Sequence, residues 1–201
     1  MTDRELPPAS ARTVDALREA IPAFWFGPPP HAERREWFRK DPAFDAGIRS
    51  RFGDALEMAL AGAFGEWCAR AQGALARVLL LDQFTRNAFR DSAKAFAGDA
   101  RALATSEDAI ARGLDPALDR YERWFLYMPM QHSEDRATQA RALELFAALA
   151  RDTGLDTPLP YARRHAQIVE RFGRFPHRNA VLGRTSTAEE LAFLRAPGSA
   201  F

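Results

Sequence analysis

Two short segments of this sequence place arginine and asparagine next to each other and close to a phenylalanine. They are QFTRNAFR (83–90) and RFPHRNAVLGR (174–184), and both contain Arg-Asn-Ala. Arginine presents a planar fork of donors, and asparagine offers a donor and an acceptor, so this chemistry suits an anion. If the segments meet in space, we expect a ligand-binding set made of Arg86, Asn87, Arg174, His177, Arg178 and Asn179.

Asp82 is predicted to lie on an apolar helix face just before the first segment. In GALARVLLLDQF (73–84), Leu75, Val78 and Asp82 recur at helical spacings of three and four. An unpaired carboxylate on such a face would be costly, so Asp82 needs a partner. Arg86, one turn later, is the nearest candidate, and the arginines of residues 171–179 come next.

The same residues support a second interpretation, a buried hydrogen-bond network that holds no ligand. In this network Arg86 and Arg178 neutralise Asp82 and either Glu134 or Asp135, and they tie helix ends together. The ligand pocket and the structural network both remain open at this stage.

His132 and His177 are the candidate catalytic residues, because imidazole exchanges protons near neutral pH. Asp82 or Glu134 would orient the histidine, and the arginines would stabilise developing negative charge. The run Ser133-Glu134-Asp135 is also typical of a helix start, with Ser133 as the cap and two acids in the first turn.

The histidine spacing does not predict a metal site. The four histidines, His31, His132, His165 and His177, show no His-x-x-x-His pair. His165 shares a helical stripe with Tyr161 and Ile168, which indicates a hydrogen-bonded core histidine. Glycine-rich phosphate loops are also missing from the sequence, so we expect no metal and no cofactor.

Composition indicates an ordinary globular protein. The chain has 201 residues, 47% hydrophobic and 27% charged, with a net charge of +1, so nucleic acid is disfavoured as a partner. Arginines gather in residues 161–184, six against the single acid Glu170. Cys68 is the only cysteine, and neither a secretory signal in MTDRELPPAS nor a bilayer-spanning run is present. We expect a cytoplasmic protein with no membrane partner.

The periodicity is helical throughout, which predicts one all-α domain over residues 1–201 with about eight to nine antiparallel-paired helices. The first should begin near Ala11, with a kink or an end at Pro22. The others should cover about 42–61, 73–84, 92–112, 116–128, 133–151 and 160–172, followed by a helix that Thr187 and Glu190 start as a capping box.

Five motifs together resemble the bacterial family called Domain of Unknown Function nine-two-four. They are FWFG (24–27), LLDQFTRNAFR (80–90), YMPMQHSED (127–135), RFGRFPHRNAVLGR (171–184) and STAEELAFL (186–194). The family is classed with the tetratricopeptide-like superfamily, so the resemblance implies a right-handed superhelix of helix pairs. No such repeat is readable in the sequence. Thr85 and Gln131 stand where the family has proline and glutamate, which argues against a catalytic role for either position.

The resemblance implies no activity, so function must be argued from the site. The first hypothesis is a binding module that holds a small anionic metabolite or an acidic peptide. The alternative is a hydrolase or lyase that acts on a small acidic substrate with His132 or His177 as general acid–base. The sequence offers many donors and no evident nucleophile, which favours binding.

Overall fold

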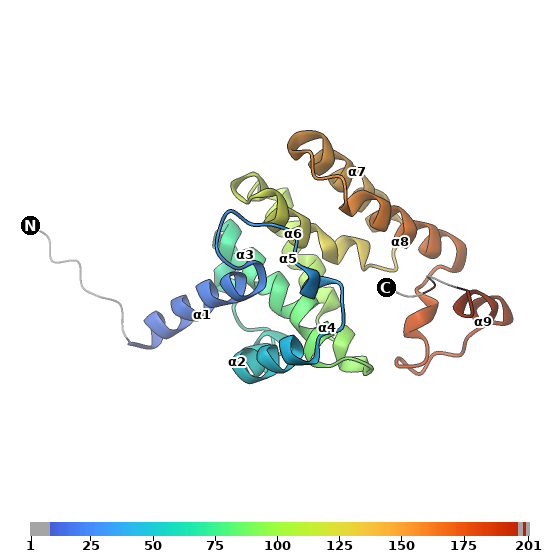
Figure 1. The fold of residues 1–201 in the computed structure, drawn as a ribbon, viewed down its shortest axis with the longest axis horizontal. Helices are drawn as coiled ribbons and strands as arrows, with labels where there is room; N and C mark the ends of the chain where they lie inside the picture. The colour runs from blue at the N-terminus through green and yellow to red at the C-terminus, as the bar shows by residue number, and fades with distance from the viewer. Residues whose placement is uncertain (1–8, 197–198, 200–201) are drawn as a thin grey trace, which may run out of the picture.

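The computed structural model of the chain describes residues 9–196 and Ser199, and these residues are helical with no strand (Figure 1). The all-α prediction is confirmed. The helices are α1 (Ala9–Phe26), α2 (Pro42–Leu60), α3 (Ala71–Val78), α4 (Thr85–Ala88), α5 (Asp99–Ala111), α6 (Arg120–Gln131), α7 (Arg136–Thr153), α8 (Pro158–Phe172) and α9 (Ala188–Leu194). No helix in the described part of the chain is long and apolar enough to cross a membrane.

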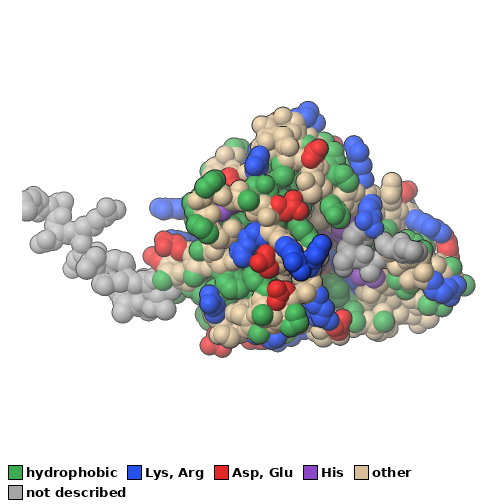
Figure 2. All heavy atoms as spheres, viewed as in Figure 1, with side chains coloured by type: hydrophobic (Ala, Val, Ile, Leu, Met, Phe, Trp, Pro, Cys, Tyr) green, Lys and Arg blue, Asp and Glu red, His purple; other side chains and the backbone are tan. Residues whose placement is uncertain are grey.

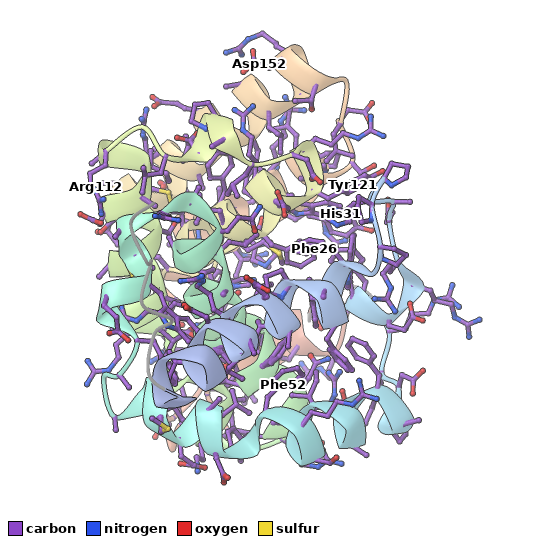
Figure 3. The ribbon with its side chains drawn as sticks, turned by 90° about the vertical axis from the view of Figure 1, so that its left-hand side faces the viewer. Phe26, His31, Phe52, Arg112, Tyr121 and Asp152 are labelled. Carbon is purple, nitrogen blue, oxygen red and sulfur yellow. The ribbon has the colours of Figure 1, made fainter. Side chains whose placement is uncertain are left out.

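The central helical run lies in the middle of the fold. It joins α3, a π-helical segment (Leu79–Phe84) and α4, so it extends beyond the expected 73–84 at both ends. Nearly all of its side chains are buried, because α1, α2, α5 and α6 surround it. Figure 3 shows α1 crossing in front of this core, with Phe52 of α2 below it. Because this helical run is buried on all sides, the carboxylate of Asp82 cannot reach water and needs partners within the protein.

Several helix boundaries form as the sequence predicts. Asp41 caps α2 by accepting hydrogen bonds from Ala43 and Phe44, and Thr187 forms the expected capping box with Glu190. Gly173 ends α8 with a φ of +68°, a left-handed conformation that favours glycine.

Proline ends neither α1 nor α6: of the two outcomes expected at Pro22, a kink or an end, the end does not occur, and α6 continues past its expected end near residue 128. Pro22 lies inside α1 and Pro129 inside α6, and both helices continue beyond them. Residues after each proline are buried, among them Trp25 and Met130, so packing offsets the hydrogen bond that each proline removes. The expected helix start at Asp115-Pro116 is only a 3-10 turn (Asp115–Ala117), because a capping box at Asp119 begins α6.

The expected helix over 92–112 is split near its start. A 3-10 turn (Ala93–Phe96) precedes α5, and Gly98 lies between them. A Cβ atom at Gly98 would lie 2.1 Å from the carbonyl oxygen of Leu81, so only glycine allows this approach. The close contact brings the first residue of α5, Asp99, beside the central helical run.

The start of α7 also differs from the expectation. Asp135, not Ser133, caps the helix by accepting hydrogen bonds from the amide and hydroxyl of Thr138. Ser133 instead accepts a hydrogen bond from the Asp135 amide. Glu134 therefore lies before the helix, where its side chain is available to a distant segment.

The C-terminal part of the fold, which begins with α7, packs on the outside of this core. Helices α7 and α8 lie side by side against α6 (Figure 1). Ile168 and Val169 of α8 form a separate small cluster with Phe175, against which Phe172 and Phe193 pack. Polar contacts, described next, join this cluster to the main core.

Candidate functional site

The carboxylate of Asp82 lies at the centre of the candidate site and is completely buried. Oδ1 is 2.9 Å from Arg86 Nη1 and 2.7 Å from His132 Nδ1, while Gln83 donates to Oδ2 at 2.6 Å. The expected partner Arg86 is confirmed. Asp82 belongs to the π-helical segment, a form of helix that often occurs at functional sites.

The pairing determines which nitrogen of His132 carries the proton. Burial alone would raise the pKa of Asp82, but Arg86 and His132 outweigh it and hold this pKa well below its usual range. Burial lowers the pKa of His132, so its ring is neutral at pH 7. An ionised carboxylate only accepts hydrogen bonds, so His132 Nδ1 carries the proton and Nε2 keeps a lone pair.

Nε2 of His132 has no hydrogen-bond partner among the described residues. About one-tenth of the His132 side chain is exposed.

The two Arg-Asn segments meet through a residue that sequence reasoning missed. Arg86 forms a bidentate pair with Asp99 at 2.9 and 3.1 Å, and Arg178 donates to the same carboxylate at 3.1 Å. Arg178 also donates to the carbonyl of His132 at 3.0 Å. Asp99 thus holds the two guanidinium groups together beside the Asp82–His132 pair.

The side chain of Arg178 is buried, and its guanidinium is enclosed by aromatic rings. Its guanidinium lies 4.7 Å from the ring centroid of Phe96 and 4.5 Å from that of Phe175. Burial lowers the pKa of Arg178 to about 10, and no described residue forms a hydrogen bond with its buried Nε. Burial and the neighbouring Arg86 charge therefore outweigh the Asp99 carboxylate in setting the pKa of Arg178.

Two further histidines lie next to His132. The ring centroid of His165 lies 5.8 Å from that of His132. Phe175 separates His165 from His177, and its ring centroid lies 5.5 Å from that of His165 and 5.6 Å from that of His177. His165 faces the core as predicted, with Nδ1 2.8 Å from the Tyr161 carbonyl oxygen. Burial lowers the pKa of His165 to about 3 and that of His177 to about 4, so both rings are neutral at pH 7.

Glu134 does not orient a histidine. It accepts hydrogen bonds from the Phe175 amide at 2.7 Å and from Arg184 at 2.6 and 3.0 Å. Burial opposes the effect, but the Arg184 hydrogen bonds keep the pKa of Glu134 below its usual range. The expected neutralisation of Glu134 or Asp135 by Arg178 is therefore replaced by an Arg184–Glu134 pair and an Asp135 cap.

The remaining residues of the expected ligand-binding set are engaged elsewhere or lack a visible role. Arg174 forms a bidentate pair with Glu190 at 2.6 and 2.8 Å. Asn179 accepts from Arg184 and donates to Ser186. Asn87 is buried, and its Nδ2 forms no hydrogen bond with residues 9–196 or Ser199. Of the six residues, the structure places Arg86, His177 and Arg178 around His132.

A different trio has ligand atoms close enough for a metal ion. One nitrogen of His31 and one oxygen each of Asp119 and Glu122 lie within 4.8 Å of one another, beside Phe26 and Tyr121 (Figure 3). Asp119 and Glu122 form the capping box of α6, and His31 contacts Asp119 at 2.5 Å. Helix capping explains this cluster without a metal.

Comparison with known proteins identifies the family of this chain and a solved structure of the same fold, but neither has an assigned activity. A family profile described as "Bacterial protein of unknown function (DUF924)" matches residues 21–198, so the chain belongs to this family and the predicted resemblance is confirmed. A solved structure, that of the protein of unknown function ATU0120 from Agrobacterium tumefaciens, is 42% identical with a TM-score of 0.82. The match covers 90% of this chain and 98% of that one. Among curated proteins the sequence has no match.

Acidification should destabilise the protein through His165. Its pKa is about 3 when folded and 6.5 ordinarily, so the unfolded state binds the proton more tightly. This stabilisation is fully present above pH 6.5 and is lost as the pH falls towards 3. At pH 5 we expect the free energy of unfolding to be about 2 kcal/mol lower than at neutral pH from this residue alone.

Urea unfolding between pH 7 and pH 4.5 measures this effect. His165→Gln should flatten this pH dependence, because the glutamine side chain does not titrate in this range. An identical pH dependence in the wild type and His165→Gln would contradict the assignment.

Proposed function

We propose that this protein is an enzyme that uses the Asp82–His132 pair as a general acid–base on a small acidic substrate. One observation carries the proposal. Asp82 holds Nδ1 of His132 at 2.7 Å, while Nε2 has no partner among the described residues. A histidine oriented in this way is typical of catalytic dyads and triads, in which the carboxylate selects the tautomer.

The electrostatic surroundings of His132 suit a base that accepts a proton and later donates it. His132 is neutral at pH 7, so Nε2 accepts a proton from water or from a substrate carbon or oxygen. The resulting imidazolium lies 2.7 Å from the Asp82 carboxylate, which stabilises it until the proton is transferred onward. In the described residues no serine, threonine or cysteine is hydrogen-bonded to His132. This favours activated water or direct proton abstraction, and hence a hydrolase or a lyase.

Turnover assays test the catalytic role. The probes are p-nitrophenyl acetate and p-nitrophenyl phosphate for hydrolysis, and malate for dehydration. We expect His132→Ala and Asp82→Asn to lower kcat/KM by about 10²–10⁴-fold, the usual contribution of general acid–base catalysis. His31→Ala is the matched control and should retain activity. His177→Ala tests the other histidine named from the sequence.

Turnover that survives in His132→Ala would contradict the proposal, as would the absence of turnover with all three probes. Circular dichroism of each variant separates lost catalysis from lost folding.

Anion binding is the second candidate function, and Arg178 is the residue that favours it. This guanidinium is buried, and its pKa is lowered to about 10. Its Nε has no hydrogen-bond partner in the part of the chain that the structure describes. An anion beside Arg178 and His177 would accept a hydrogen bond from this Nε and would favour the charged guanidinium. The other donors are less available, because Arg86, Arg174 and Asn179 are paired within the protein.

Thermal unfolding with phosphate, sulfate or citrate tests this function. By linkage, an anion that binds the folded state raises the melting temperature. We expect Arg178→Ala to abolish that rise, and Arg49→Ala, an exposed arginine on α2, to preserve it. If no anion raises the melting temperature and Arg178→Ala unfolds the protein, the arginines form a structural network only.

A further inference from the structure

A long groove follows the contact between α7 and α8. It consists of two adjoining hollows of about 470 and 450 Å³ that share Leu143 and Arg163. Their lining runs along α7 from Arg136 to Arg151, which corresponds to roughly 22 Å of helix. A groove of this length matches a helical segment of roughly 15 residues.

The floor of the groove is apolar. It is made of small and branched side chains that both helices contribute, namely Ala140, Leu143, Ala147, Leu159, Ala166 and Val169. Side chains of this kind accept the apolar stripe of an amphipathic helix, whose contacts recur every three to four residues.

The rim of the groove is basic. Four arginines line it, against two acids: Arg136, Arg151, Arg163, Arg171, Glu144 and Glu170. Both acids already have arginine partners, since Glu144 contacts Arg141 and Glu170 contacts Arg136.

Arg151 and Arg163 form no ion pair with any described residue, although both are exposed. Figure 2 shows that basic side chains are scattered over the visible face of the molecule, including the region of α7 and α8. The groove therefore has two uncompensated guanidinium groups above an apolar floor.

We propose that the α7–α8 groove binds an acidic amphipathic helix of a partner protein. The apolar stripe of that helix packs on the floor, and its carboxylates pair with Arg151 and Arg163. Charge complementarity selects an acidic partner and speeds its association. The groove shares no lining residue with the Asp82–His132 site, so this interaction and the catalytic proposal succeed or fail separately.

Fluorescence anisotropy with a designed probe tests the proposal. The probe is a fluorescein-labelled 15-residue helical peptide with leucine and alanine on one face and glutamate on the other. Its comparison peptide has lysine in place of each glutamate. We expect the acidic peptide alone to bind, and its affinity to fall as salt increases.

Variants locate the binding surface. Arg163→Glu should weaken the acidic peptide by roughly tenfold, because an attractive charge becomes repulsive. Ala140→Trp, at an exposed floor position, should block binding by filling the groove. Arg49→Glu makes the same charge change on α2 and should bind as the wild type does.

Three results would overturn the proposal. They are no binding of the acidic peptide to the wild type, equal binding of the lysine peptide, and equal affinities of Arg163→Glu and Arg49→Glu.

Discussion

The fully buried negative charge of Asp82 is the constraint on which the rest of this structure depends. A carboxylate in the middle of a central helix is tolerated only with close positive partners and hydrogen bonds. Arg86 supplies the charge one turn away, and Asp99 then balances Arg86. Arg178 adds to Asp99 and donates to the His132 carbonyl. These successive ion pairs and hydrogen bonds connect the central helical run with α5, α6 and the C-terminal segment. That segment has only a small hydrophobic cluster of its own.

The same pairing gives His132 a defined chemical state. Because Asp82 is ionised and accepts hydrogen bonds only, the proton of the neutral ring lies on Nδ1. The buried charge that costs stability therefore also prepares a basic nitrogen at Nε2. Stability and chemistry are coupled here, and a variant that removes one partner leaves an uncompensated charge behind.

Local patterns in the sequence predicted part of this site. Helical spacing indicated that Asp82 and His165 face the core and that Arg86 pairs with Asp82, and the repeated Arg-Asn-Ala suggested that two segments meet. Asp99 and Arg184 were missed, because their contacts join residues 79 and 50 positions apart, beyond any helical period. The end of α6 was predicted too early, near residue 128, because burial of the residues after Pro129 outweighs the local preference of proline.

The protonation state of His132 is the point at which fold and proposed chemistry meet. Long-range ¹H–¹⁵N correlation NMR of the full-length protein at pH 7 reports which imidazole nitrogen carries the proton. The structure predicts a neutral ring with the proton on Nδ1 and an unprotonated Nε2. A proton on Nε2 alone, or a doubly protonated ring at this pH, would contradict the role assigned to Asp82 and His132.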